Sequence, residues 1–232
     1  MTHRNTARIM GILFIIATVA FSLSVVLLEP VLGAPNYLVS IFTNGQRVAA
    51  GTLLELINHI AVVGIAVVSY PILKRFDERF AVGYVAARSI ESVLFTIGTM
   101  HLIALANVSH AFVTAGAPSD SYFHTLGDVL LAGHDWDNAA PLFVAFSLGA
   151  LMLNYQLYRT KLVPRWLSGW GLVAATLILA ERTILMSGFE LSSSTVIMMD
   201  TPIMLQEMVF AIWLIIKGFN SAVLTEEKTS LV

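Results

Sequence analysis

The chain contains no cysteine, so it has no disulfide, thiolate metal site or cysteine nucleophile. Charge is scarce as well. Asp, Glu, Lys and Arg make up 12% of the residues, about half of the roughly 25% that is usual in soluble domains. The formal net charge is only −2, and the basic residues are scattered rather than gathered in one stripe. We therefore exclude nucleic acid as a partner.

Hydrophobic residues make up 57% of the chain. They form six long apolar stretches, and a bilayer core of about 30 Å needs about 20 helical residues to cross it. The sequence therefore predicts an all-α, polytopic membrane helix bundle that resides in a lipid bilayer. The six predicted transmembrane helices span residues 9–28, 49–73, 81–107, 139–158, 167–186 and 198–217.

Lysine and arginine are distributed unevenly between alternate connections, and this bias sets membrane orientation. One set of connections carries Arg4, Arg8, Lys74, Arg75, Arg79, Arg159, Lys161, Arg165, Lys217 and Lys228. The opposite set contains only Arg47. We therefore expect both termini to be cytoplasmic, and an even number of spans agrees because it puts both termini on the same side.

The predicted spans follow one another without a credible internal repeat or a linker. We expect a single six-helix transmembrane domain over residues 1–219 and a disordered cytoplasmic tail over 220–232. The segment 121–131 is predicted to form a short amphipathic helix on the outer face of the membrane.

Ionisable side chains lie inside the predicted spans, where they mark a functional site by default. Glu55 and His59 are four residues apart, and Arg88 and Glu91 are three apart. Each pair therefore shares one face of its helix.

The other candidates come from three spans. His101 lies near the outer end of the third span, Glu181 and Arg182 are adjacent in the fifth, and Gln206 and Glu207 are adjacent in the sixth. Adjacent helical residues point about 100° apart, so Glu181 and Arg182 are not expected to be each other's main partner. At 1.5 Å per residue, most candidates lie about 6 to 15 Å below the outer surface, with Arg88 and Glu91 deeper. The second, third, fifth and sixth spans can thus line one polar cavity that is biased outward. The candidate ligand-binding or proton-carrying residues are Glu55, His59, Arg88, Glu91, His101, Glu181, Arg182, Gln206 and Glu207.

The charges within the spans do not balance. Four glutamates face two arginines, Arg88 and Arg182. A lone buried carboxylate is costly, so the surplus has to be met by a proton, a histidine, water or a bound cation or amine. The structural alternative is that the pairs only hold helices together, and for Arg88 with Glu91 we weigh it equally.

More specific functions, such as haem binding, metal binding or catalysis, have weaker support in the sequence. His59 and His101 could be the axial ligands of a b-type haem, although no haem motif accompanies them. No spacing resembles a metal-binding signature, and no phosphate loop or nucleophile elbow occurs. Glu55, Glu91 or Glu207 could act as an acid or base on a lipid-like substrate.

Three stretches of the sequence are similar to one known family. They are residues 7–13 (ARIMGIL), 163–171 (VPRWLSGWG) and 206–219 (QEMVFAIWLIIKGF). Together they resemble the bacterial membrane family called domain of unknown function 4386. The resemblance implies a multi-helix protein of the bacterial cytoplasmic membrane and assigns no catalytic residue, although its last motif includes Glu207.

The residues leave three functions open. The first is a protein that binds or transports a small or amphipathic molecule in the polar cavity. The second is a membrane-embedded enzyme that uses carboxyl acid and base chemistry. The third is a structural or regulatory membrane subunit.

Overall fold

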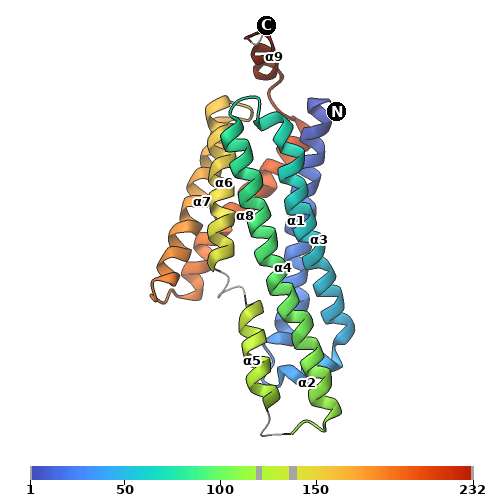
Figure 1. Cartoon of the computed structure of the whole chain (residues 1–232). Helices are drawn as coiled ribbons and strands as arrows, with labels where there is room; N and C mark the ends of the chain where they lie inside the picture. Colours follow the sequence, from blue (N-terminus) through green and yellow to red (C-terminus); the bar gives the residue numbers. More distant parts are fainter. Residues whose placement is uncertain (1, 119–121, 136–139, 231–232) are drawn as a thin grey trace. The chain divides into compact units, whose positions relative to one another are not determined.

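The computed structural model describes residues 2–118, 122–135 and 140–230, and these residues form helices joined by short connections (Figure 1). No strand occurs in these ranges, as the sequence predicts. Residue 139 of the predicted fourth span and residues 231–232 of the predicted tail lie outside the described residues. The helices are α1 (His3–Leu32), α2 (Tyr37–Thr43), α3 (Gly45–Leu73), α4 (Glu78–Thr114), α5 (Tyr122–His134), α6 (Ala140–Thr160), α7 (Arg165–Met186), α8 (Ser193–Ile216) and α9 (Ser221–Ser230).

Six of these helices, α1, α3, α4, α6, α7 and α8, are long and apolar enough to cross a membrane. They correspond one to one with the six predicted spans, and most extend a few residues beyond the predicted ends. Large apolar side chains on them are exposed, for example Val26 at 63% and Ile60 at 73%. Such surfaces imply a lipid bilayer around the helices. The chain is therefore a multi-pass membrane protein.

The chain divides into two compact units, and the single transmembrane domain expected from the sequence stays a prediction. Unit 1 comprises Met1–Thr18, Ala61–Ser92 and Ala140–Val232, and unit 2 comprises Val19–Ile60 and Val93–Ala139. Helices α1, α3 and α4 contribute one part to each unit. These helices have 29 to 37 residues, long enough for their two parts to pack against different neighbours.

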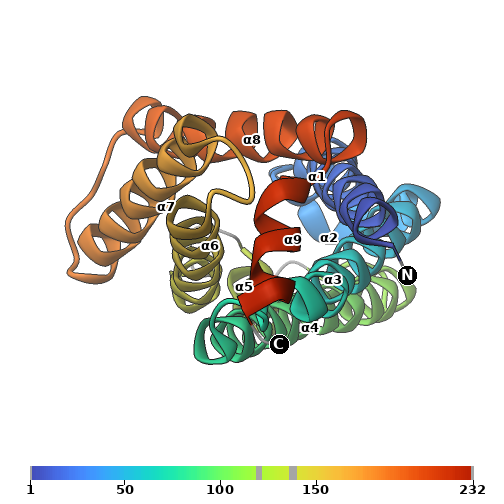
Figure 2. The same ribbon diagram turned by 90° about the horizontal axis from the view of Figure 1, so that it is seen from above.

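Unit 1 is built around α7, which packs against both α6 and α8. Figures 1 and 2 show α6 and α7 side by side. Its core includes Phe14, Tyr84 and Phe210, and the rings of Phe14 and Phe210 meet edge to face at 5.5 Å. Gly11 lets α1 approach α8 closely, because a Cβ there would lie 2.6 Å from the carbonyl oxygen of Ala211.

Unit 2 contains α2, α5 and the remaining parts of α1, α3 and α4. Its core is formed by buried apolar residues that include Leu38, Leu102 and Phe112. Helix α5 matches the predicted amphipathic helix and extends it to His134. Helix α2 was not predicted, because seven residues show too little periodicity to be recognised.

Residues Ser221–Ser230, after α8, form helix α9 in the structure, and the disordered tail expected for 220–232 stays a prediction. Gly218 takes a positive φ of 74°, which ends α8, and the Asn220 amide then donates to the Leu162 carbonyl at 2.9 Å. Helix α9 follows, with Leu224 buried against the unit 1 core. One apolar anchor and one backbone hydrogen bond thus connect this segment to the rest of unit 1.

Candidate functional site

Three helices of unit 1 bring polar side chains to one place, which we call the Arg88 chamber. Helix α4 supplies Tyr84, Arg88 and Glu91, α6 supplies Asn154, and α8 supplies Gln206 and Glu207. Most of these residues line a small cavity of about 10 Å³, which is about the volume that a single water molecule needs. The cavity is closed on its apolar side by Phe14, Leu153 and Phe210.

Arg88 and Glu91 form the ion pair that their spacing predicts. Arg88 Nη1 donates to Glu91 Oε2 at 2.9 Å, and the two side chains are 4% and 2% exposed. The guanidinium also lies 5.4 Å from the centre of the Phe146 ring. Its Nε atom, however, is buried and has no hydrogen-bond partner among the described residues.

Gln206 and Asn154 connect three helices of unit 1 by hydrogen bonds. Gln206 Nε2 lies 3.4 Å from Asn154 Oδ1 and 3.3 Å from the Leu167 carbonyl oxygen, and Asn154 Nδ2 donates to Ala150. Gly171 of α7 leaves the space for this amide, since a Cβ there would overlap the Asn154 side chain.

Glu207 and Tyr84 differ from these satisfied groups. In the described part of the chain, the partly buried Glu207 carboxylate accepts no hydrogen bond and makes no direct ion pair, although Arg88 acts on it electrostatically. The Tyr84 side chain is 1% exposed, and its hydroxyl has no hydrogen-bond partner there. Both residues line the small cavity. An unsatisfied carboxylate and an unsatisfied hydroxyl facing one cavity indicate a site for a small polar species.

A second group in unit 1 joins α7 to α8 through Arg182. Arg182 Nη2 donates to Asp200 Oδ2 at 3.1 Å, while Arg182 Nε lies 3.6 Å from Glu181 Oε2. The guanidinium also lies 4.0 Å from the centre of the Phe143 ring. The main partner of Arg182 is thus a residue on another helix, as predicted from the adjacency of Glu181 and Arg182.

A third group lies in unit 2 and centres on Glu55, which is 1% exposed. Thr99 Oγ1 of α4 donates to Glu55 Oε2 at 2.7 Å, and His134 Nε2 of α5 lies 2.9 Å from Glu55 Oε1. Both carboxylate oxygens therefore have partners, and the three side chains connect α3, α4 and α5.

The two histidines considered for haem lie in unit 2 in apolar and backbone contacts. The His59 ring stacks on Phe95 with 5.1 Å between ring centres, and His59 Nδ1 lies 3.4 Å from Thr96 Oγ1. His101 Nδ1 lies 2.8 Å from the Ile97 carbonyl oxygen, so this nitrogen carries the hydrogen. The His101 ring also lies against Gly133 of α5, where a Cβ would be 2.6 Å from His101 Cδ2. Among the described residues, no three His, Asp or Glu side chains are grouped to hold a metal ion.

Unit 2 also carries a groove of about 500 Å³, bordered by α2, α3 and α4, which we call the α3–α4 groove. Its walls include Leu53, Leu56, Leu102 and Ile103. His110 lies beside Phe42 of α2, with 5.7 Å between the ring centres, and Asn107 lines the groove about one turn before His110 on α4. The groove was not predicted from the sequence, because its walls are ordinary apolar positions of two spans.

The structure distributes the candidates assigned to one cavity over three groups. Arg88, Glu91, Gln206 and Glu207 come together, and Glu181 with Arg182 forms a separate group. The remaining three, Glu55, His59 and His101, belong to unit 2.

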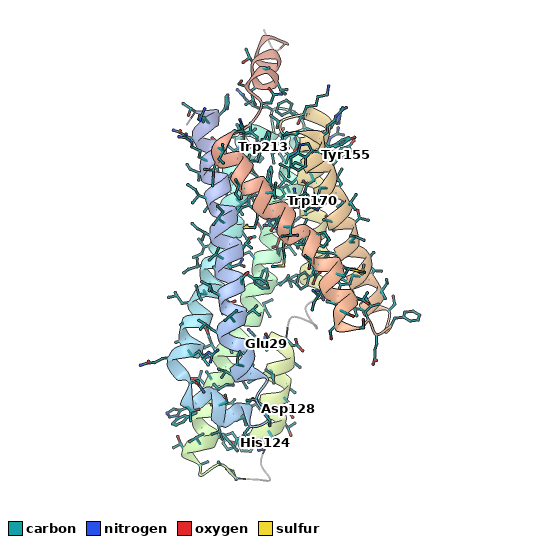
Figure 3. The ribbon with its side chains drawn as sticks, turned by 180° about the vertical axis from the view of Figure 1, so that it is seen from behind. Glu29, His124, Asp128, Tyr155, Trp170 and Trp213 are labelled. Carbon is teal, nitrogen blue, oxygen red and sulfur yellow. The ribbon has the colours of Figure 1, made fainter. Side chains whose placement is uncertain are left out.

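The candidates chosen from the sequence leave out several polar residues of these groups, among them Tyr84, His134 and Asp200. Asp200 lies inside α8, which begins at Ser193 and has Ser192 as its cap. The signal for His134 was available, because Phe123, Gly127 and His134 are the buried residues of α5 and share one helical face. Asp128 and His124 lie one turn apart on the same helix (Figure 3), and Asp128 accepts a 2.7 Å hydrogen bond from Tyr37.

A family model with the description "Domain of unknown function (DUF4386)" matches residues 9–218. The match covers nearly the whole chain and all six long helices, and it confirms the resemblance of the three sequence motifs. Searches of the curated proteins and of the solved structures return no significant match.

Proposed function

Since the chain belongs to the family described as Domain of unknown function (DUF4386) and has six membrane-spanning helices, we propose that it binds a small amphipathic molecule from the bilayer. The α3–α4 groove is the proposed binding site. The groove's size and its division into a polar and an apolar end support this proposal.

The size of the groove suits a single-chain amphiphile. Its volume of about 500 Å³ falls within the roughly 300–1,000 Å³ of typical small-molecule pockets. Most of its walls belong to α3 and α4, which are long and apolar enough to cross a membrane, so a molecule dissolved in the bilayer is proposed to reach it without passing through water.

The polarity of the groove changes along its length, and this observation carries the proposal. His110 and Leu102 both line it and are eight residues apart on α4, which corresponds to about 12 Å along the helix. Thr52 in the middle is satisfied by the Val48 carbonyl, so Asn107 and His110 are the polar groups left to meet a ligand. A polar head at His110 and an apolar tail beside Leu53 and Leu102 match this gradient.

The orientation proposed for the chain puts the polar end of the groove at the extracytoplasmic surface of the membrane. Both termini are proposed to lie in the cytoplasm of a bacterial cell, because the basic residues gather on one set of connections. The N-terminus and the C-terminus of the chain lie at the same end of unit 1 (Figure 1). This placement agrees with an even number of spans, which puts both termini on one side of the membrane. Helix α4 then ends at Thr114 on the extracytoplasmic side.

The buried charges of unit 2 are proposed to hold the groove in shape rather than to contact the ligand. Glu55 precedes the groove residue Leu56 and connects α3 to α4 and α5 through Thr99 and His134. Because these hydrogen bonds join α3 to α4 and α5, we propose that they fix the separation of the helices that form the groove.

A fluorescent fatty acid tests the proposal as a single-chain amphiphile. We expect saturable binding to the purified protein in mild detergent, and we expect Ile103→Trp to weaken it at least about tenfold by filling the groove, a loss of about 1.4 kcal/mol. Met100→Trp is the matched control, because Met100 is 63% exposed on the same helix and does not line the groove. Equal affinities of the two variants, or no saturable binding, would rule out the groove as the site.

A further inference from the structure

We propose that the Arg88 chamber is a proton-carrying site, in which Glu207 takes up a proton beside one bound water molecule. The site is in unit 1 and is independent of the amphiphile groove proposed for unit 2. Its chemistry is proton binding by a carboxyl group inside a membrane-spanning helix.

The first argument is the set of unsatisfied groups around the cavity. Tyr84 is almost fully buried and lines the cavity, and its hydroxyl has no partner among the described residues. Arg88 also lines the cavity, and its Nε is likewise without a partner there. A water molecule in the cavity could accept from Arg88 Nε and exchange hydrogen bonds with Tyr84 and Glu207. A buried water usually makes about three hydrogen bonds, so this cavity offers enough partners for one.

The second argument is the charge balance of the chamber. The charged and titratable groups that face it are Tyr84, Arg88 and Glu91 from α4 and Glu207 from α8. The α6 residue Asn154 and the α1 residue Phe14 add no charge. One arginine and two ionised glutamates sum to −1, so the buried chamber lacks one positive charge.

The size of the cavity decides which positive species fits. A volume of about 10 Å³ holds one water molecule but leaves no room for a hydrated metal ion or a ligand amine. A proton requires no volume of its own. Proton uptake is therefore the way in which this narrow chamber reaches neutrality.

Glu207 is the acceptor because Glu91 already has a partner. Glu91 Oε2 accepts the 2.9 Å hydrogen bond from Arg88, whereas the Glu207 carboxylate accepts none in the described part of the chain. In the proposed step, a hydronium ion of the surrounding solvent supplies the proton. One of its O–H bonds breaks as an O–H bond forms on one carboxylate oxygen of Glu207, and the remaining water stays in the solvent. The chamber changes from −1 to 0, and release of the proton restores the starting charge.

Infrared spectroscopy of the full-length protein in detergent tests this step. At about pH 7, exposed glutamates with a pKa of about 4.3 are ionised, so a remaining protonated-carboxyl C=O band comes from buried groups. We expect the wild-type protein to show this band and E207Q to lose one component of it. E190Q is the matched control, because Glu190 is exposed in the α7–α8 connection, and it should keep the whole band.

A second variant keeps the test decisive if E207Q does not fold. Tyr84→Phe removes the hydroxyl from the chamber while retaining the ring in the core. We expect the Glu207 component to shift in frequency in Tyr84→Phe, because the hydrogen bonding around the carboxyl and its water changes. A wild-type protein without a protonated-carboxyl band would overturn the proposal. So would a band that is the same in the wild type, E207Q and Tyr84→Phe.

Discussion

His134 of α5 and Glu55 of α3 are 79 residues apart in the sequence, yet His134 Nε2 lies 2.9 Å from Glu55 Oε1. Both side chains are almost completely buried. The contact fastens a short helix to a membrane-spanning one by a polar bond in an apolar surrounding. Its removal should therefore affect stability directly.

His134→Ala should lower the free energy of unfolding by about 3 kcal/mol, because a buried carboxylate loses one of its two partners. Thr99 still donates to the other oxygen, which keeps the loss near the lower end of the range for such pairs. The measurement is unfolding in mixed detergent micelles. Thr125→Ala, at an exposed position of the same helix, is the control and should change stability by less than about 0.5 kcal/mol. Equal losses in both variants would show that the pair contributes nothing specific.

Arg182→Lys should destabilise the protein by about 1 kcal/mol or more, although it keeps the charge. Lysine cannot reproduce both the 3.1 Å bond to Asp200 and the planar contact with the Phe143 ring. Thermal unfolding in detergent measures the effect, with the exposed substitution Arg4→Lys as the control. An Arg182→Lys variant as stable as Arg4→Lys would mean that the cluster acts only as a net charge.

Gly171→Ala should lower stability by about 1–3 kcal/mol, as expected for overpacking in a tight core. A Cβ at this position would overlap Asn154, whose amide is held by Ala150 and Gln206 and cannot easily turn away. Gly45→Ala is the matched control, because nothing lies within 4 Å of a Cβ at Gly45. Should the two variants unfold at the same temperature, the contact between α6 and α7 would be looser than the structure shows.

Tyr37 should make the protein lose stability in strongly alkaline solution. Burial raises the pKa of Tyr37 above its usual value of about 10, and its hydrogen bond and proximity to the Asp128 carboxylate raise it further. Since the folded-state pKa lies above the unfolded one, this contribution is complete below about pH 10 and is lost as the pH rises through the folded-state pKa. Above about pH 10, the unfolding temperature of Tyr37→Phe should therefore fall less steeply with pH than that of the wild type. Parallel curves for the two proteins would contradict this assignment.

Labelling of engineered cysteines should show on which side of the membrane each connection lies. The chain has no cysteine of its own, so no native residue of it would be labelled. A membrane-impermeant maleimide added to intact bacterial cells should label Glu190→Cys, in the α7–α8 connection, and leave Arg79→Cys unlabelled until the cells are opened. Arg79 is a suitable site because its side chain is 92% exposed. The reverse pattern would invert the proposed orientation.

The sequence predicted the features that depend on local spacing and composition. The six spans follow from apolar length, and the Arg88–Glu91 pair follows from a spacing of three residues on one helix. The sequence did not predict Asp200 as the partner of Arg182. The two residues lie on different helices, and the spacing of residues within one helix does not show how two helices pack. His134 was missed for the same reason, since its contact with Glu55 depends on where α5 packs.

The candidate site was predicted in its residues and not in its grouping. Glu55, Arg88 and Glu207 lie within helices that are long and apolar enough to cross a membrane, as the sequence predicts, and their depth in the membrane stays a prediction. Depth alone does not tell which faces of the helices meet, so one predicted cavity became three polar groups. The α3–α4 groove could not be predicted from the sequence, because a groove arises from the shapes of neighbouring side chains and most of its walls are apolar.

The close contact between Gly133 and the His101 ring also has an evolutionary consequence. With a Cβ at Gly133 placed 2.6 Å from His101 Cδ2, a larger residue at one position is tolerated only with a smaller one at the other. Across related sequences, the two positions should therefore vary together, and their covariation would record the docking of α5 on α4 in the history of the family.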